Sequence, residues 1–202
     1  MQIRTGDISF VIDHAINRAI SDNPDPVYAL IDATQIGVTG HSLGGSAALG
    51  IGRTRGDVGA VVALESPFLC DIVGVDNGEF VWNEDAYPVS VLNICSDSSW
   101  SDLDEWPQYT VNSRLLVDAD ATAYSVHMQR AGHLTLTDLA LTSPFLTRMF
   151  DGHTASIDTR YYLTTIDQLA LGFFDCYLKG KGEFAPQAVH GEIEQQTQCQ
   201  TN

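Results

Sequence analysis

The sequence has few basic residues for its length. Its 202 residues include 10 Lys plus Arg against 26 Asp plus Glu, which gives a formal net charge of −16. A surface of this sign repels phosphate backbones and anionic lipid headgroups, so we expect no nucleic-acid partner. The hydrophobic fraction, 44%, is that of an ordinary globular protein.

Long apolar runs and targeting patterns are also lacking. The longest runs, such as 61–64 and 89–92, are far shorter than the roughly 20 residues of a membrane-spanning helix. No basic segment followed by an apolar one marks a secretory signal at the N-terminus. We therefore expect no membrane span and a cytoplasmic location for the chain as given, unless an upstream targeting segment precedes it.

Cofactor motifs are lacking as well. The four cysteines are scattered along the chain without metal-ligand spacing, so we expect structural thiols and no metal. Neither a GxGxxG nor a GxxxxGK[ST] loop opens a helix, so no nucleotide cofactor is expected.

What the sequence does contain is a series of short apolar runs separated by helical patterns. Runs at 59–64, 89–94 and 121–128 are typical of buried strands, and a shorter strand is predicted at 35–39. Helical spacing predicts helices over 7–21, 46–53 and 158–179. We therefore predict an α/β protein with a mainly parallel sheet and flanking helices. Residues 1–191 form a single domain in this interpretation, and 192–202 form a flexible tail.

The segment Gly40-His41-Ser42-Leu43-Gly44 lies between a predicted strand and a predicted helix. A serine hydroxyl is a weak nucleophile that needs exposure, a nearby base and a donor for the developing oxyanion. A sharp strand–turn–helix bend supplies the exposure, and it directs the N–H of Leu43 toward the oxyanion. The sequence therefore predicts a nucleophile elbow at Ser42.

The stretch from Ile36 to Leu49 resembles the nucleophile region of the α/β-hydrolase superfamily. More narrowly, it is similar to the platelet-activating-factor acetylhydrolase-like and chlorophyllase-like branches. Ala63-Leu64-Glu65-Ser66-Pro67, the 132–138 segment (Gly-His-Leu-Thr-Leu-Thr-Asp) and the closing 173–179 helix share this likeness. The resemblance runs from about residue 7 to residue 184.

The fold's usual order is serine, then acid, then histidine, so the base must follow Ser42. Of the six histidines, His133 follows a predicted strand and sits beside a glycine, which frees the backbone to bring its imidazole over Ser42. His127 lies within a predicted strand and reads as a packed residue. We therefore take His133 as the base.

Two carboxylates stand at plausible strand ends for the acid that orients this histidine. Asp97 matches the position common to α/β-hydrolases in general. Glu65 ends the strand after the elbow helix, where the two narrower branches carry an Asp. The resemblance favours Glu65, and the choice between Glu65 and Asp97 stays open here.

The resemblance also implies that the chain begins inside the usual fold. Only 41 residues precede Ser42, too few for the strands that normally come first, which leaves a partial α/β-hydrolase fold of about four core strands. The elbow strand would then be an exposed sheet edge that invites association. A homodimer, an N-terminal partner segment or a truncated gene would each account for this.

Together these features predict a serine hydrolase that cleaves small-molecule carboxylic esters through a Ser42–His133–acid triad and an acyl-enzyme. The alternative is a catalytically weak fragment that serves as an interaction module. In the acidic loop after Asp97, Trp100, Trp106 and Tyr109 are candidates to line an acyl or alcohol pocket, with local packing as the alternative.

Overall fold

The computed structural model describes residues 2–103, 105–110, 121–151, 159–186 and 193–198. The helical elements are α1 (Gln2–Ala19), the 3-10 turns η1 (Tyr28–Leu30) and η2 (Leu69–Asp71), α2 (Leu43–Thr54), α3 (Asp97–Trp100), α5 (Leu139–Thr142), α6 (Pro144–Asp151) and α7 (Thr159–Tyr177). The strands are β1 (Ile36–His41), β2 (Val58–Leu64), β3 (Ile72–Asp76), β4 (Glu79–Trp82), β5 (Ser90–Ser96), β6 (Ala123–Met128) and β7 (Ile193–Gln198).

The main sheet has the strand order β1-β2-β5-β6-β7. The first four strands are parallel, and β7 pairs with β6 in the antiparallel direction. Because the four parallel strands run the same way, their carboxyl ends meet at one edge of the sheet. This confirms the predicted α/β class with a mainly parallel sheet of four core strands.

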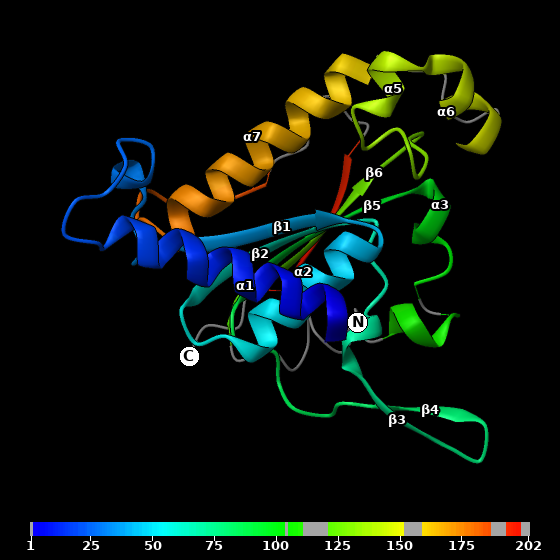
Figure 1. Cartoon of the computed structure of the whole chain (residues 1–202). Helices are drawn as coiled ribbons and strands as arrows, with labels where there is room; N and C mark the ends of the chain where they lie inside the picture. The colour runs from blue at the N-terminus through cyan, green and yellow to red at the C-terminus, as the bar shows by residue number, and fades with distance from the viewer. Residues whose placement is uncertain (1, 104, 111–120, 152–158, 187–192, 199–202) are drawn as a thin grey trace.

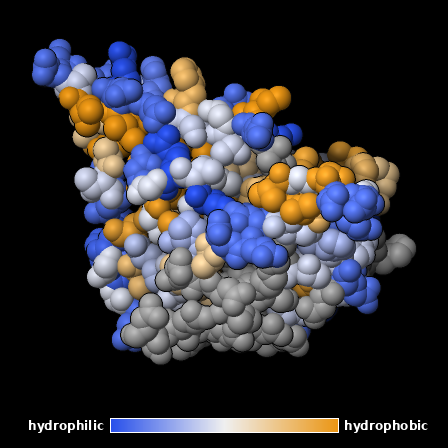
Figure 2. Space-filling model, turned by 90° about the horizontal axis from the view of Figure 1, so that it is seen from below, coloured by the Kyte–Doolittle hydropathy of each residue, from blue (hydrophilic) through white to orange (hydrophobic). Residues whose placement is uncertain are grey.

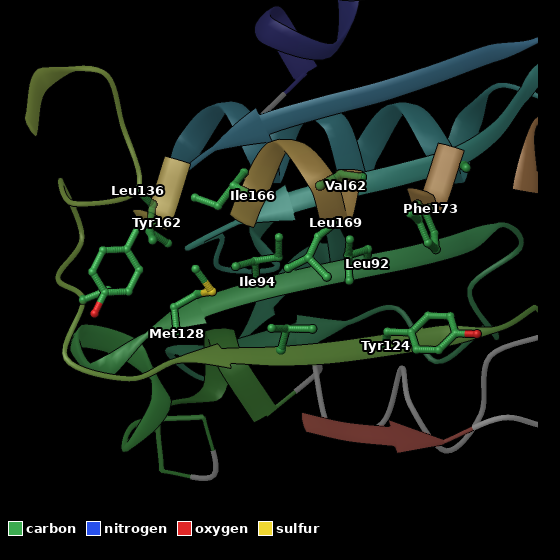
Figure 3. Close-up of a cluster of buried hydrophobic side chains, with 13 residues drawn as sticks. Val62, Leu92, Ile94, Tyr124, Met128, Leu136, Tyr162, Ile166, Leu169 and Phe173 are labelled. Atoms are coloured by element: carbon green, nitrogen blue, oxygen red, sulfur yellow. The ribbon is translucent and has the colours of Figure 1, made fainter. Parts of the chain in front are cut away.

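Helices cover both faces of the sheet (Figure 1), so the strands contribute to two cores. Alternate residues of β2 belong to different cores: Val61 and Ala63 pack with α2, whereas Ala60 and Val62 pack on the side of α7. Side chains of β2, β5 and β6 meet α7 around Leu169 in the second core (Figure 3). Burial on both faces explains why the strand sequences are apolar without alternation.

Three segments differ from the sequence expectations. Helix α1 begins at Gln2 rather than near residue 7, and the side chain of Thr5 lies against Gly50 of α2. A hairpin, β3–β4, projects from the body (Figure 1) and turns at Asn77-Gly78, both with positive φ. The segment expected to be a flexible tail contains β7, which covers the edge of β6.

The surface carries apolar side chains in separate groups. Viewed from the side on which the hairpin projects, hydrophobic residues form separate patches among hydrophilic ones (Figure 2). Hairpin side chains such as Val73 and Val75 are 65% exposed. Within the described segments, no helix has the length and apolar character to cross a membrane.

Replacement of Phe173 by Ala tests the core on the α7 side. The Phe173 ring is fully buried and packs within 4.7 to 6.2 Å, centroid to centroid, of the rings of Tyr124, Tyr177 and Phe184. The cavity left by Phe173→Ala should lower the free energy of unfolding by about 3–5 kcal/mol, measured by urea denaturation. Leu171→Ala, on the same helix but 61% exposed, is the control and should change it by less than about 0.5 kcal/mol. Equal effects would contradict the assignment of this core.

Candidate active site

Ser42 lies at the bend between β1 and α2. Its backbone has φ 56° and ψ −124°, a conformation that is strained for a residue with a side chain. The bend is tied to the next strand because the Ser42 N–H donates to the Leu64 carbonyl at 2.8 Å. The Ser42 carbonyl accepts from Ser46 N–H at 3.0 Å in the first turn of α2. The sequence motif thus folds into the strand–turn–helix elbow that its residues predict.

Leu43 is the first residue of α2. The first N–H groups of an α-helix have no acceptor within the helix, and the helix dipole adds positive potential there. The Leu43 N–H therefore belongs to the set of donors that an anion at this helix end would meet.

Glycines on either side allow the close approach of β1 and α2. A Cβ on Gly40 would collide with the Gly44 carbonyl group and lie 2.7 Å from the Gly45 nitrogen. A Cβ on Gly45 would collide with the Ser66 hydroxyl and lie 2.6 Å from the Gly40 oxygen. Gly44 has nothing within 4 Å of its Cβ position. The tight contact therefore needs glycine at positions 40 and 45, whereas a side chain at position 44 would meet open space.

Glu65 follows β2 directly and carries a buried carboxylate, 1% exposed. Its φ of 48° turns the chain away from the sheet, while its N–H still donates to the Ile94 carbonyl at 2.8 Å. Oε1 accepts hydrogen bonds from the Ser96 N–H and, at 2.9 Å, from the Ser99 hydroxyl. Oε2 lies 3.6 Å from His133 Nδ1, which is within ion-pair distance but is longer than a hydrogen bond.

This environment sets the charge of Glu65. Burial alone would raise the pKa of its carboxyl group, but the His133 side chain and the donors of Ser96 and Ser99 outweigh burial. The net pKa of Glu65 lies below its usual value, so the group is a buried carboxylate at neutral pH.

His133 lies in the turn after β6, and its side chain is 39% exposed. Its N–H donates to the Ser98 hydroxyl at 3.0 Å. Its carbonyl accepts from His41 Nε2 at 2.8 Å, and the two imidazole rings are 4.5 Å apart, centroid to centroid. Since a carbonyl only accepts, His41 carries its proton on Nε2. Burial lowers the pKa of His41 below its usual value, despite this hydrogen bond.

The residues after His133 are held by a second carboxylate. Asp151, the last residue of α6, accepts from the N–H groups of Leu134 and Thr135 at 2.8 to 3.0 Å. It also accepts from the Thr135 hydroxyl at 3.0 Å. These bonds fix the loop directly after the imidazole.

Asp97 has different partners from Glu65. Its Oδ1 accepts from His127 Nε2 at 2.8 Å, and its Oδ2 accepts from the Arg130 N–H at 2.9 Å. His127 is buried in β6, as its place in a predicted strand suggested. Two carboxylate–histidine pairs therefore lie near the same sheet edge, Glu65 with His133 and Asp97 with His127.

The aromatic residues after Asp97 are partly engaged in packing. The Trp100 ring stacks on His127 at 4.4 Å with an interplanar angle of 4°. Trp106 is half exposed, and the centroid of its ring lies 6.3 Å from that of the Tyr109 ring. Burial raises the pKa of Tyr109 to about 12. Of the other histidines, His14 is on α1, whereas 153 and 190 lie outside the described residues.

Sequence reasoning missed His41, Asp151 and the serines of the 96–99 segment. The signal for the serines was present as a polar run, Ser-Asp-Ser-Ser, at the carboxyl end of a buried strand. Within the described segments, no group of three or more His, Cys, Asp or Glu side chains is arranged to hold a metal ion.

Comparison with known proteins gives a structural likeness. No protein-family model matches the chain, and no curated protein sequence does. Among solved structures, the chain is similar to a ferulic acid esterase from Streptomyces cinnamoneus, with a TM-score of 0.68 at 20% identity. The match covers 96% of this chain and 54% of the esterase, so the chain spans about half the length of that protein. The likeness shows the fold alone, an α/β fold with a mainly parallel sheet.

Glycine-to-alanine replacements test the elbow. Gly40→Ala and Gly45→Ala should each lower the free energy of unfolding by about 1–3 kcal/mol, because backbone or a buried side chain must shift to admit the methyl group. Gly44→Ala is the matched control and should be neutral or slightly stabilising, since its methyl meets open space. Denaturant unfolding measures all three. A larger loss in Gly44→Ala than in the other two would refute this packing.

The buried carboxylate predicts a pH dependence of stability. The pKa of Glu65 is lower in the folded state than in the unfolded state. The contribution of the ionised carboxylate to the free energy of unfolding is therefore fully present above the unfolded-state pKa, and it is lost as the pH falls through the folded-state pKa. The difference in unfolding free energy between wild type and Glu65→Gln should be largest near pH 6–7, at about 2 kcal/mol or more, and should shrink below about pH 4. Urea denaturation at a series of pH values measures it. A constant difference across this range would contradict the lowered pKa.

Proposed function

We propose that this chain is a serine hydrolase that cleaves carboxylic esters. The observation that carries the proposal is the strained Ser42 at the elbow, at the same sheet edge as an imidazole backed by a buried carboxylate, His133 with Glu65. The fold likeness to a ferulic acid esterase supports an ester-hydrolase kind of function. The narrower likeness to acetylhydrolase-like and chlorophyllase-like proteins stays a prediction.

In the proposed acylation step, Ser42 Oγ attacks the acyl carbon while His133 Nε2 takes the hydroxyl proton. The carbonyl oxygen becomes an oxyanion that the Leu43 N–H stabilises. When this intermediate collapses, the bond to the alcohol oxygen breaks, and His133 passes the proton to the leaving alcohol. The Ser42 ester that remains is the acyl-enzyme.

Deacylation repeats the same chemistry with water. His133 takes a proton from the water as its oxygen attacks the acyl carbon, and the proton then returns to Ser42 Oγ as the carboxylic acid leaves. Glu65 holds a proton on His133 Nδ1, which leaves Nε2 free to act as the base, and it stabilises the imidazolium. Its burial strengthens this effect, because little water screens the carboxylate.

Glu65 rather than Asp97 is the triad acid in this proposal. Glu65 Oε2 is 3.6 Å from His133 Nδ1, while both oxygens of Asp97 accept hydrogen bonds from other groups, on His127 and Arg130. A glutamate reaches one bond further than the aspartate of the resembled branches. The backbone at Glu65 has φ 48°, a left-handed conformation, directly after the end of β2.

The second candidate function is an interaction module with weak or no catalysis. It is favoured by the position of β1 at the edge of the sheet and by exposed apolar side chains on α1, such as Phe10 and Val11. Such an edge with apolar neighbours suits association with a second copy or another polypeptide. The two candidates differ in whether Ser42 reacts.

A fluorophosphonate probe distinguishes them. Wild type should be labelled covalently at Ser42 and should hydrolyse p-nitrophenyl acetate, and Ser42→Ala should lose both. His133→Ala should slow labelling by about 100-fold or more, because no base then takes the serine proton. The controls are Ser21→Ala and His14→Ala, which should keep wild-type rates. Mass spectrometry locates the label, and absence of labelling in folded wild type would favour the interaction module.

A further inference from the structure

The 96–99 segment holds both members of the Glu65–His133 pair. The Ser96 N–H and the Ser99 hydroxyl donate to Glu65, and the Ser98 hydroxyl accepts from the His133 N–H. A change in the conformation of this segment would therefore alter the placement of the carboxylate and of the imidazole. The distance that matters is the 3.6 Å between Glu65 Oε2 and His133 Nδ1.

Asp97, in the middle of this segment, binds it to β6 and the following turn. Its N–H donates to the Ala131 carbonyl at 3.1 Å. One carboxylate oxygen accepts from His127 Nε2 at 2.8 Å and the other from the Arg130 N–H at 2.9 Å. Arg130 has φ 62°, a left-handed conformation that is uncommon outside glycine, in the turn that leads to His133.

His127 provides the fixed end of this connection. It belongs to β6, and its backbone is paired with Cys95 of β5. Its side chain is only 9% exposed, and its ring is stacked against Trp100, the last residue of α3. Both ends of α3 thus contact one imidazole, Asp97 through a hydrogen bond and Trp100 through stacking.

We propose that Asp97 and His127 form a positioning pair that sets the separation between Glu65 and His133. The proposal rests on the function proposed above. In this role, neither Asp97 nor His127 touches the substrate. Asp97 connects two parts of the chain: the 96–99 segment, which binds Glu65, and the turn that carries His133. His127 anchors Asp97 to the sheet. A misplacement of a reacting group by about 1 Å can lower a rate by about 100-fold, so a smaller shift still has a measurable effect.

This role differs from that of a triad acid. The triad acid contacts the catalytic imidazole itself, so its loss leaves the imidazolium without a counter-charge. Loss of a positioning pair leaves all catalytic groups present but displaced, which lowers the rate of chemistry and leaves substrate binding nearly unchanged. Because the two residues act only together, the losses in kcat of the two single variants should not add up in the double variant.

The test compares Asp97→Asn, His127→Gln and the double variant with Glu65→Gln. For p-nitrophenyl acetate, each single variant should lower kcat about tenfold with KM within about twofold, and the double variant should also lose about tenfold rather than 100-fold. Glu65→Gln should lose about 100-fold or more. Trp100→Phe, which keeps an aromatic ring on His127, should retain more activity than Trp100→Ala. Asp102→Asn is the matched control and should behave as wild type, because the Asp102 carboxylate accepts from the Ser101 hydroxyl and its backbone N–H, which donates to the Ser99 carbonyl, is unchanged by the substitution.

A spectroscopic measurement makes the result independent of turnover. The imidazole nitrogen resonances of His133 should shift in Asp97→Asn and His127→Gln but not in Asp102→Asn. Unlabelled Ser42 in wild type would reject the proposed function, while these resonances would still test the positioning. Unchanged His133 resonances, additive losses in kcat, or an Asp97→Asn loss as large as that of Glu65→Gln would each overturn the proposal.

Discussion

A carboxylate removed from water must be matched by donors, and Glu65 imposes this requirement on the carboxyl edge of the sheet. One carboxylate oxygen accepts hydrogen bonds from the Ser96 N–H and the Ser99 hydroxyl, and the other lies near the His133 imidazole. Without them, the charge would be buried and unpaired, at a cost of several kcal/mol. The turn after β5 and the turn after β6 therefore have to converge on the end of β2. The geometry of the candidate site follows from this one buried charge.

The parts of the fold that depend on local pattern were predictable from sequence. Strands β2 and β5 were visible because burial on both faces leaves unbroken apolar runs, and α7 because Tyr162, Ile166 and Leu169 recur at helical spacing. The start of α1 was not, because its first turn is packed against α2 rather than marked by a local signal. The β3–β4 hairpin did have a local signal, Asn77-Gly78, which favours a tight turn.

The candidate site divides in the same way. The elbow at Ser42 is a local structure, so the order of glycine, serine and glycine was enough to find it. The pairing of carboxylates with histidines depends on how β2, β5 and β6 lie side by side and on how the turns after them bend. Nothing in the spacing of Glu65, Asp97, His127 and His133 specifies which side chains meet. The serines of the 96–99 segment were visible as a polar run, but the sequence does not specify that they bind Glu65 and His133.

The two carboxylate–histidine pairs differ in a way that physical chemistry can rank. The Glu65 carboxylate is 1% exposed, whereas that of Asp97 is 36% exposed. Water screens a charge in proportion to its access, so a charge at Glu65 acts on its imidazole through a lower effective dielectric constant. The exposure of the imidazoles runs the other way, 39% for His133 and 9% for His127. The proposed catalytic pair needs a shielded acid and an accessible base, and of these two pairs Glu65–His133 combines them. The buried imidazole of His127 and the partly exposed carboxylate of Asp97 have the opposite arrangement, which suits an anchor between segments.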